Sequence, residues 1–143
     1  GFCAPIEQSS ELSKELNCSK GDVWDRITNV ELFKDYKFDV AEIEVVGHNG
    51  KKWIEYSKQG AITEYEIIES VEGEKLVVKI FDKALNIEKK RVYTIFGSGN
   101  SSILSIKEFT RVEKLLLRST LAIAGNKQEI KKELNNIAEH VNL

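Results

Sequence analysis

The chain has 143 residues, of which 41% are hydrophobic and 31% are charged, and its formal net charge at pH 7 is -2. These values predict one globular domain with a sizeable core, and they exclude the strongly basic surface typical of nucleic-acid-binding proteins. The most apolar run, between residues 115 and 125, is interrupted by Arg118 and is too short to span a bilayer. We therefore expect no nucleic-acid partner and no helix that crosses a membrane.

The residues that commonly bind metals are few and scattered. The two cysteines, Cys3 and Cys18, are too few for a disulfide framework, so we expect unpaired thiols. The two histidines are His48, in an expected turn, and His140, close to the C-terminus. This spacing does not match a metal site, and we expect no metal and no other cofactor.

The sequence contains no methionine, even at position 1. We therefore expect a processed or truncated piece of a longer protein, with residues 1–7 forming a frayed or truncated N-terminus. A cytoplasmic location is the first prediction. The alternative is a protein tethered to a membrane through a removed N-terminal segment, which would place the domain beside a bilayer.

The first third of the chain predicts one strand and two short helices. Residues 9–16 alternate between apolar and polar side chains, which is typical of a strand with one wet face. Ser19 is a plausible N-cap for a helix over residues 20–27. A second short helix is expected over residues 30–36.

Six further strands and a long helix follow. Turn signals such as Asn49-Gly50 separate the strands and supply the positive φ angle that a tight hairpin needs. The expected strands cover residues 39–47, 51–59, 61–71, 74–83, 86–96 and 101–111.

The last stretch, from about Arg118 to Val141, predicts a helix with one apolar stripe. The stripe consists of Ile123, Ile130, Leu134, Ile137 and Val141. A lone amphipathic helix needs a surface to cover its stripe, and a sheet is the only surface that this sequence offers. We therefore predict an α+β fold in the order β-α-α-β-β-β-β-β-β-α, with a curved antiparallel seven-stranded sheet around the C-terminal helix.

Three local patterns stand in the first third of the chain. The stretch from Cys18 to Asp25 carries Val-Trp near its end, Phe33 and Tyr36 are aromatic residues three positions apart, and residues 41–47 lie in an expected strand. Together these patterns resemble the START/Bet v 1-like superfamily of helix-grip proteins, which includes polyketide cyclases and dehydrases. The first is similar to the Ala-Pro-x-x-x-Val-Trp pattern that leads into the family's first helix, the second to its aromatic pair, and the third to its typical second strand. Two departures are that Cys18-Ser19 replaces Ala-Pro and that the aromatic residues are often Trp in the family. The resemblance covers about residues 6–141.

The resemblance implies a single helix-grip domain over residues 1–143, with a cavity between the sheet and the C-terminal helix. Members of this superfamily commonly bind hydrophobic molecules such as lipids, quinones, sterols or polyketides there. The superfamily holds enzymes and non-catalytic carriers alike, so the fold does not decide the activity. The expected partner is therefore a hydrophobic small molecule.

Alternation along the strands suggests which side chains face the cavity. In the strand from Ala61, Glu64 and Glu66 are expected to face water. Tyr65 and Ile67 should then face the cavity, and Glu69 is a further candidate for the inward face. Tyr65 would offer an aromatic surface and a hydroxyl, although a purely structural role in the core is as plausible.

The last strand carries apolar residues on both faces, so its orientation is open. Similarity to the aromatase/cyclase members favours Lys107 and Phe109 inward, where Lys107 would pair with Glu69 or meet an anionic ligand. An outward Lys107 is the alternative.

Three further aromatic residues are candidates for the ligand site. Phe33 and Tyr36 would line its mouth, unless they only hold the second helix to the sheet. Tyr56 could reach the cavity, but Trp53 and Glu55 compete with it for the inward face of the same strand.

Three functions remain open at this point. The first is binding or carriage of a hydrophobic molecule, which the aromatic inward residues favour. The second is a cyclase- or dehydrase-type enzyme, for which Tyr65, Lys107 and Glu69 are the only acid–base set that we nominate. The third is a protein-interaction module, which an exposed apolar patch near residues 115–117 would support.

Overall fold

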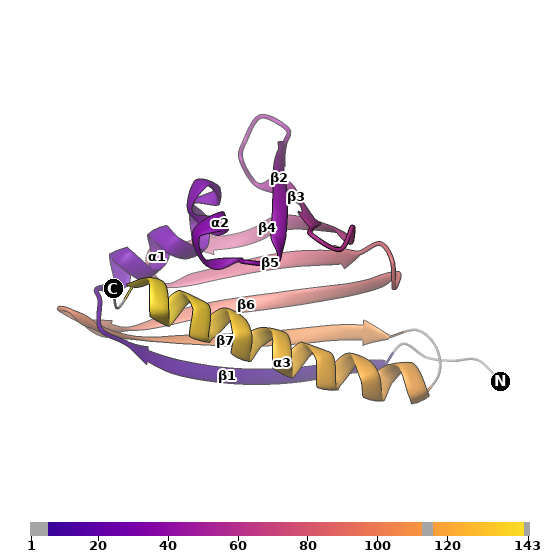
Figure 1. Cartoon of the computed structure of the whole chain (residues 1–143). Coiled ribbons are helices and arrows are strands. Elements are labelled where there is room, and N and C mark those ends of the chain that lie inside the picture. The colour runs from indigo at the N-terminus through magenta and orange to yellow at the C-terminus, as the bar shows by residue number, and fades with distance from the viewer. Residues whose placement is uncertain (1–5, 113–115, 142–143) are drawn as a thin grey trace.

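The computed structural model describes residues 6–112 and 116–141, and it describes the side chains of residues 9–111 and 127–141. The expected order of elements is confirmed (Figure 1). In sequence they are β1 (Ile6–Leu16), α1 (Lys20–Thr28), a 3-10 turn η1 (Val30–Leu32), α2 (Phe33–Tyr36), β2 (Val40–Val46), β3 (Lys52–Ser57), β4 (Ile62–Val71), β5 (Lys75–Asp82), β6 (Ile87–Ser98), β7 (Ser101–Val112) and α3 (Leu116–Val141).

The strands form one antiparallel seven-stranded sheet in the order β1-β7-β6-β5-β4-β3-β2. From β2 to β7 each strand pairs with the next one along the chain. β1 pairs with β7, so β1 and β2 are the two edge strands of the sheet. The helix α3 lies across one face of the curved sheet, and α1 and α2 lie near the C-terminal end of α3 (Figure 1). The predicted α+β architecture is therefore correct.

Local signals in the sequence account for the short helices. Ser19 is the N-cap of α1, and its Oγ accepts a hydrogen bond of 3.2 Å from the Asp22 amide. The single helix expected over residues 30–36 is instead η1 followed by α2. The side chain of Asn29 caps η1 by accepting from the Glu31 amide at 3.1 Å.

The hairpin between β6 and β7 depends on a glycine. Gly97 has a φ of +145°, and a Cβ added to it would lie 2.4 Å from the Ser101 carbonyl oxygen. Any other residue would therefore clash with the backbone of the partner strand. This close pairing lets β6 continue to Ser98, two residues beyond the end expected from the sequence at Phe96.

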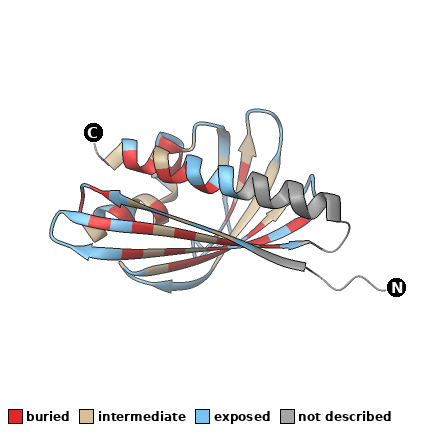
Figure 2. Ribbon diagram, turned by 90° about the horizontal axis from the view of Figure 1, so that it is seen from below, coloured by how far each residue is buried: buried red, intermediate tan, exposed pale blue. Residues whose placement is uncertain are grey.

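The apolar core lies between the sheet and the C-terminal half of α3 (Figure 2). The predicted stripe supplies Ile130, Leu134 and Ile137, each at most 3% exposed. The side chain of Ile123, which belongs to the same predicted stripe, lies outside the described residues. The strands and α1 contribute the facing side chains, which include Leu16, Val23, Ile27, Ile95, Leu104 and Ile106.

Cys18 is a buried free thiol, while Cys3 lies outside the described residues. In the part of the chain that the structure describes, none of the helices has the length and hydropathy needed to cross a membrane.

Candidate functional site

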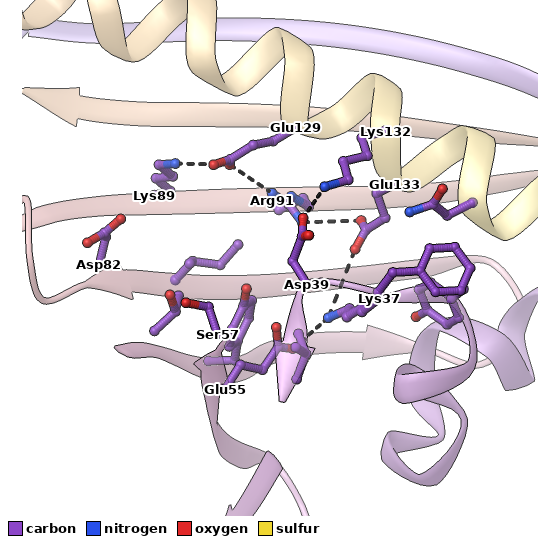
Figure 3. Close-up of a pocket in the computed structure, with 17 residues that line it drawn as sticks. Lys37, Asp39, Glu55, Ser57, Asp82, Lys89, Arg91, Glu129, Lys132 and Glu133 are labelled. Atoms are coloured by element: carbon purple, nitrogen blue, oxygen red, sulfur yellow. Dashed lines mark hydrogen bonds and ion pairs between the residues drawn. The ribbon is translucent and has the colours of Figure 1, made fainter. Parts of the chain in front are cut away.

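A pocket of about 250 Å³ lies between α3, the segment that joins α2 to β2, and the inner face of β3 to β6 (Figure 3). The joining segment, residues 37–39, forms one wall together with Tyr36 and Val40 at its two ends. The opposite wall comes from α3, and the strands form the floor. The pocket thus lies where the sequence resemblance places a cavity, between the sheet and the C-terminal helix.

The strand register explains which side chains meet on the floor. Tyr65 on β4 pairs with Trp53 on β3 and with Ile80 on β5, and Ile80 pairs in turn with Lys89 on β6. Side chains directly opposite each other in a ladder share one face of the sheet. Tyr65, Ile80 and Lys89 therefore line the pocket together, and the Trp53 ring stacks on Tyr65 with the centroids 5.3 Å apart.

Lys37, in the segment between α2 and β2, connects the two sides of the pocket. Its Nζ donates to Glu55 Oε2 at 2.6 Å and lies 4.0 Å from a carboxylate oxygen of Glu133 on α3. It also lies over the rings of Phe33 and Tyr65, 4.2 and 5.0 Å from their centroids. These ion-pair and cation–π contacts hold the segment against the sheet and the helix.

A second group of buried charges is centred on Arg91 of β6. Its guanidinium donates to Glu108 on β7 at 2.9 Å and to Glu133 on α3 at 3.2 Å. The hydroxyl of Tyr93 also donates to Glu133, at 2.7 Å. Two atoms of the group, Arg91 Nε and Glu108 Oε2, are buried without a hydrogen-bond partner among the described residues.

The protonation states at the site follow from burial and from these contacts. Burial raises the pKa of Tyr65 and of Tyr93 well above the usual value, and nearby carboxylates add to this effect. Burial alone would raise the pKa of Glu133, but Arg91, Lys37 and the hydrogen bonds it accepts outweigh burial and lower that pKa. At neutral pH the site therefore combines the ionised carboxylate of Glu133 with protonated hydroxyls of Tyr65 and Tyr93.

The mouth of the pocket is bordered by ion pairs that reach the solvent. Lys132 on α3 donates to Asp39 in the joining segment. One turn earlier on α3, Glu129 accepts from Lys89 at 3.3 Å (Figure 3). Phe38, which also lines the pocket, is 53% exposed. Ligand access therefore passes beside charged side chains and an exposed aromatic ring.

Tyr65 and Ile67 lie on the inner face of the sheet, as expected, and of the predicted ligand residues Tyr65 and Tyr36 line this pocket. Tyr65 lines its floor, and Tyr36 lines its wall while donating to the Arg26 carbonyl at 2.8 Å. Ile67 packs against the core beside the pocket. Phe33 is 1% exposed and packs on Trp53, with the ring centroids 5.4 Å apart. Phe33 is therefore part of the core and does not line the mouth.

The prediction that Lys107 and Phe109 face inward is wrong. Leu104, Ile106 and Glu108 hold the inner positions of β7 and are fully buried. Lys107 instead lies on the outer face, where its side chain is 43% exposed and its Nζ lies 5.1 Å from the Phe109 ring centroid. Leu104 and Ile106 occupy the inner face of β7, and because side chains alternate along a strand, Glu108 is buried with them.

The inward placement of Glu69 and Tyr56 is wrong as well. A bulge interrupts the pairing of β4 with β5 between Ile67 and Glu69, so simple alternation fails beyond that point. Glu69 is 53% exposed and pairs with Lys75 at 3.3 Å. Tyr56 lies on the outer face, where its hydroxyl donates to Glu44 at 3.3 Å. The acid–base set of Tyr65, Lys107 and Glu69 is therefore not brought together.

Sequence reasoning missed most of the charged residues at the site. One usable signal was the strict alternation of β6, which places Lys89 and Arg91 in the same inward series as Ile87 and Tyr93. The other was the position of Glu133 beside Leu134 in the apolar stripe of α3. No sequence pattern pointed to Lys37, because the partners that hold it inward come from distant elements.

Neither the known protein families nor the curated proteins include a match to this sequence. Solved structures do match it. Truncated norcoclaurine synthase from Thalictrum flavum has a TM-score of 0.75 at 11% identity, with 99% of this chain and 97% of that chain covered. The same enzyme in complex with dopamine and hydroxybenzaldehyde has a TM-score of 0.72 at 12% identity, with coverages of 96% and 87%.

A third match is DynU16, a protein of the dynemicin biosynthetic locus, with a TM-score of 0.73 at 12% identity. It covers 94% of this chain, while this chain spans only 47% of DynU16. At such low identities the matches establish the fold alone. The chain has the helix-grip fold that norcoclaurine synthase and DynU16 share, as the sequence resemblance predicted.

Proposed function

We propose that this protein binds a compact amphipathic molecule, with an aromatic or similarly flat apolar body, in the pocket beneath α3. The observation that supports this most directly is the composition of the pocket. Its floor has the apolar surfaces of Tyr65 and Ile80, and its rim has the exposed ring of Phe38. Polar groups surround these surfaces, which is the combination expected of a small-molecule site.

The Tyr65 hydroxyl is the polar group best placed to orient such a ligand. Tyr65 lines the pocket, and no hydrogen bond joins its hydroxyl to another residue in the described part of the chain. Its raised pKa keeps the hydroxyl protonated at neutral pH, so it can donate to a ligand oxygen. An oxygen of the ligand would accept the hydrogen bond that the Tyr65 hydroxyl does not donate to any residue in the described part of the chain.

The volume of the pocket narrows the range of hydrophobic ligands that the sequence suggests. At about 250 Å³ it lies below the range of about 300–1,000 Å³ that is common for drug-sized ligands. Charged residues also line it on two sides, among them Arg91 and Glu133. Both features favour a small molecule with polar substituents over a long-chain lipid.

The geometry gives less support to the other two functions. Glu133 has a lowered pKa and Tyr93 a raised one, so neither is suited to exchange protons near pH 7. The pocket itself argues against a filled core that serves only a protein partner. The apolar patch considered for that function, at residues 115–117, lies among side chains that the structure does not describe.

An NMR titration with benzamide, a small neutral amphipathic ring, tests the proposal. We expect amide shift changes that cluster at Lys37, Asp39 and Tyr65. Tyr65→Phe should weaken binding about two- to tenfold, the effect of one lost hydrogen bond. Tyr56→Phe on the outer face is the matched control and should leave binding unchanged. Shift changes confined to the outer face, or equal effects of both substitutions, would contradict the proposal.

A further inference from the structure

The cations that line the pocket differ in how firmly their partners are held. Lys37 pairs with Glu55, a carboxylate that is itself 6% exposed. Arg91 pairs with Glu108, which is fully buried. Both partners are fixed by the sheet and by surrounding contacts. These two cations are therefore neutralised inside the protein, whether or not a ligand is present.

Among the buried cations of the pocket, Lys89 is the exception; Lys132, which pairs with the exposed Asp39, is itself exposed. Lys89 is 8% exposed, so a charge on its ammonium group has lost most of its hydration. Among the described residues, its only carboxylate within ion-pair distance is Glu129, at 3.3 Å. The Glu129 side chain is 58% exposed. A buried cation thus depends on one carboxylate at the protein surface.

The bond between these two residues is easily exchanged. Glu129 lies on the solvent-facing side of α3, so water can hydrate its carboxylate once the ion pair is broken, and it can leave at little cost. Lys89 cannot leave, since its strand position directs it into the pocket beside Tyr65 and Ile80. Replacing Glu129 by an anion inside the pocket would give Lys89 a partner shielded from water, and such shielded pairs are stronger.

From these contacts, and on the basis of the function proposed above, we propose that the ligand carries a carboxylate that displaces Glu129 and binds Lys89. The apolar body of the ligand then lies on Tyr65 and Ile80. Arg91 also lies 4.0 Å from Glu129, but Glu108 and Glu133 already pair with it, so Lys89 is the cation that the displaced carboxylate leaves without a partner.

The alternative to a ligand with a carboxylate is a cationic ligand that pairs with Asp82. This carboxylate also lines the pocket, and it accepts a hydrogen bond of 3.1 Å from the Leu85 amide. Asp82 is only half-buried, so water already stabilises its charge. Lys89 is more deeply buried and therefore gains more from a ligand of opposite charge. This difference favours an anionic over a cationic ligand.

Three probes of nearly equal shape decide between these possibilities: benzoate, neutral benzamide and benzylammonium. We expect wild-type protein to bind benzoate most tightly and benzylammonium most weakly, as measured by NMR titration at low salt. Lys89→Gln should weaken benzoate binding about tenfold or more, because a charged hydrogen bond is lost. It should change benzamide binding less than twofold.

Glu129→Gln provides a second variant that does not disturb the core, because the side chain is exposed. It should tighten benzoate binding about two- to fivefold, since the competing carboxylate is gone. Lys107→Gln, a lysine on the outer face, is the matched control and should change nothing. The fold of each variant is checked by its amide spectrum.

The outcomes separate this inference from the proposed function. If benzamide binds in the pocket but benzoate has no advantage over it, or if benzylammonium binds more tightly, only the carboxylate assignment is overturned. The same holds if Glu129→Gln leaves benzoate affinity unchanged. If none of the three probes binds in the pocket, the proposed function fails and this inference fails with it.

Discussion

The interior between α3 and the sheet has two ends with opposite chemistry. At one end Leu16, Leu104 and Ile106 pack against Ile130 and Ile137, and each of these side chains is fully buried. Apolar side chains can adjust their rotamers until they fill the space between two elements. The result is a closed core.

At the other end, equally buried positions carry charges. Arg91 on β6 is 6% exposed, and Glu108 is fully buried on β7, the strand that also carries Leu104 and Ile106. Charged groups must keep hydrogen-bond distances and directions to offset the loss of hydration. They therefore cannot collapse freely, and the pocket lies on this side. Charged residues thus line the open part of the interior, whereas apolar side chains fill the closed part.

The largest expected effect comes from breaking the charged end. Arg91→Met leaves Glu108 buried without its cation and Glu133 with only Lys37, 4.0 Å away, and we expect a loss of about 3–5 kcal/mol in the free energy of unfolding. Urea denaturation monitored by Trp fluorescence measures it. A triple variant that adds Glu108→Leu and Glu133→Leu should recover at least half of this loss. A triple variant no more stable than the single one would show that the charges are not the cause.

A somewhat smaller effect is expected at the apolar end. Leu104→Ala removes a fully buried side chain and should cost about 2–5 kcal/mol. The adjacent Ile103 is 44% exposed on the outer face, and Ile103→Ala should cost less than about 1 kcal/mol. The same denaturation experiment compares the two. Equal losses would mean that the inner face of β7 has been assigned wrongly.

The smallest expected effect is a loss of stability at alkaline pH, which is absent near neutral pH. Burial raises the pKa of Tyr36, Tyr65 and Tyr93 well above the usual value. The folded state thus keeps these protons where the unfolded state loses them, so the stabilisation is complete below about pH 10 and declines above it. Denaturation between pH 8 and 11 should show stability falling only above pH 10, together with late ionisation of tyrosine absorbance. Unchanged stability up to pH 11 would contradict the burial of these hydroxyls.

Much of the fold could be predicted because it depends on patterns within short stretches. The stripe of Ile130, Leu134 and Ile137 has helical spacing, and glycine-containing turns separate most of the consecutive strands. Such patterns act within one element and need no knowledge of its partners. The order of elements, the seven-stranded sheet and the covering helix followed from them.

The candidate site could be predicted only in part, for a reason that Lys107 and Glu69 illustrate. The strand that carries Lys107 has apolar residues on both faces, so alternation alone cannot orient it. Glu69 follows a bulge, which shifts the series by one residue. Tyr65 precedes the bulge on the same strand, and its inward position was predicted correctly.

By itself, the sequence determined the elements, their order and the amphipathic helix, because hydrophobic periodicity and turn chemistry are local properties. The tertiary structure alone decided that Lys37, Arg91, Glu108 and Glu133 meet in one buried group. A charged residue at an inward position is costly until its partner arrives, and here the partners come from β3, β6, β7 and α3. Lys37, Arg91 and Glu133 line the pocket, so this long-range pairing also decides which charges the pocket contains.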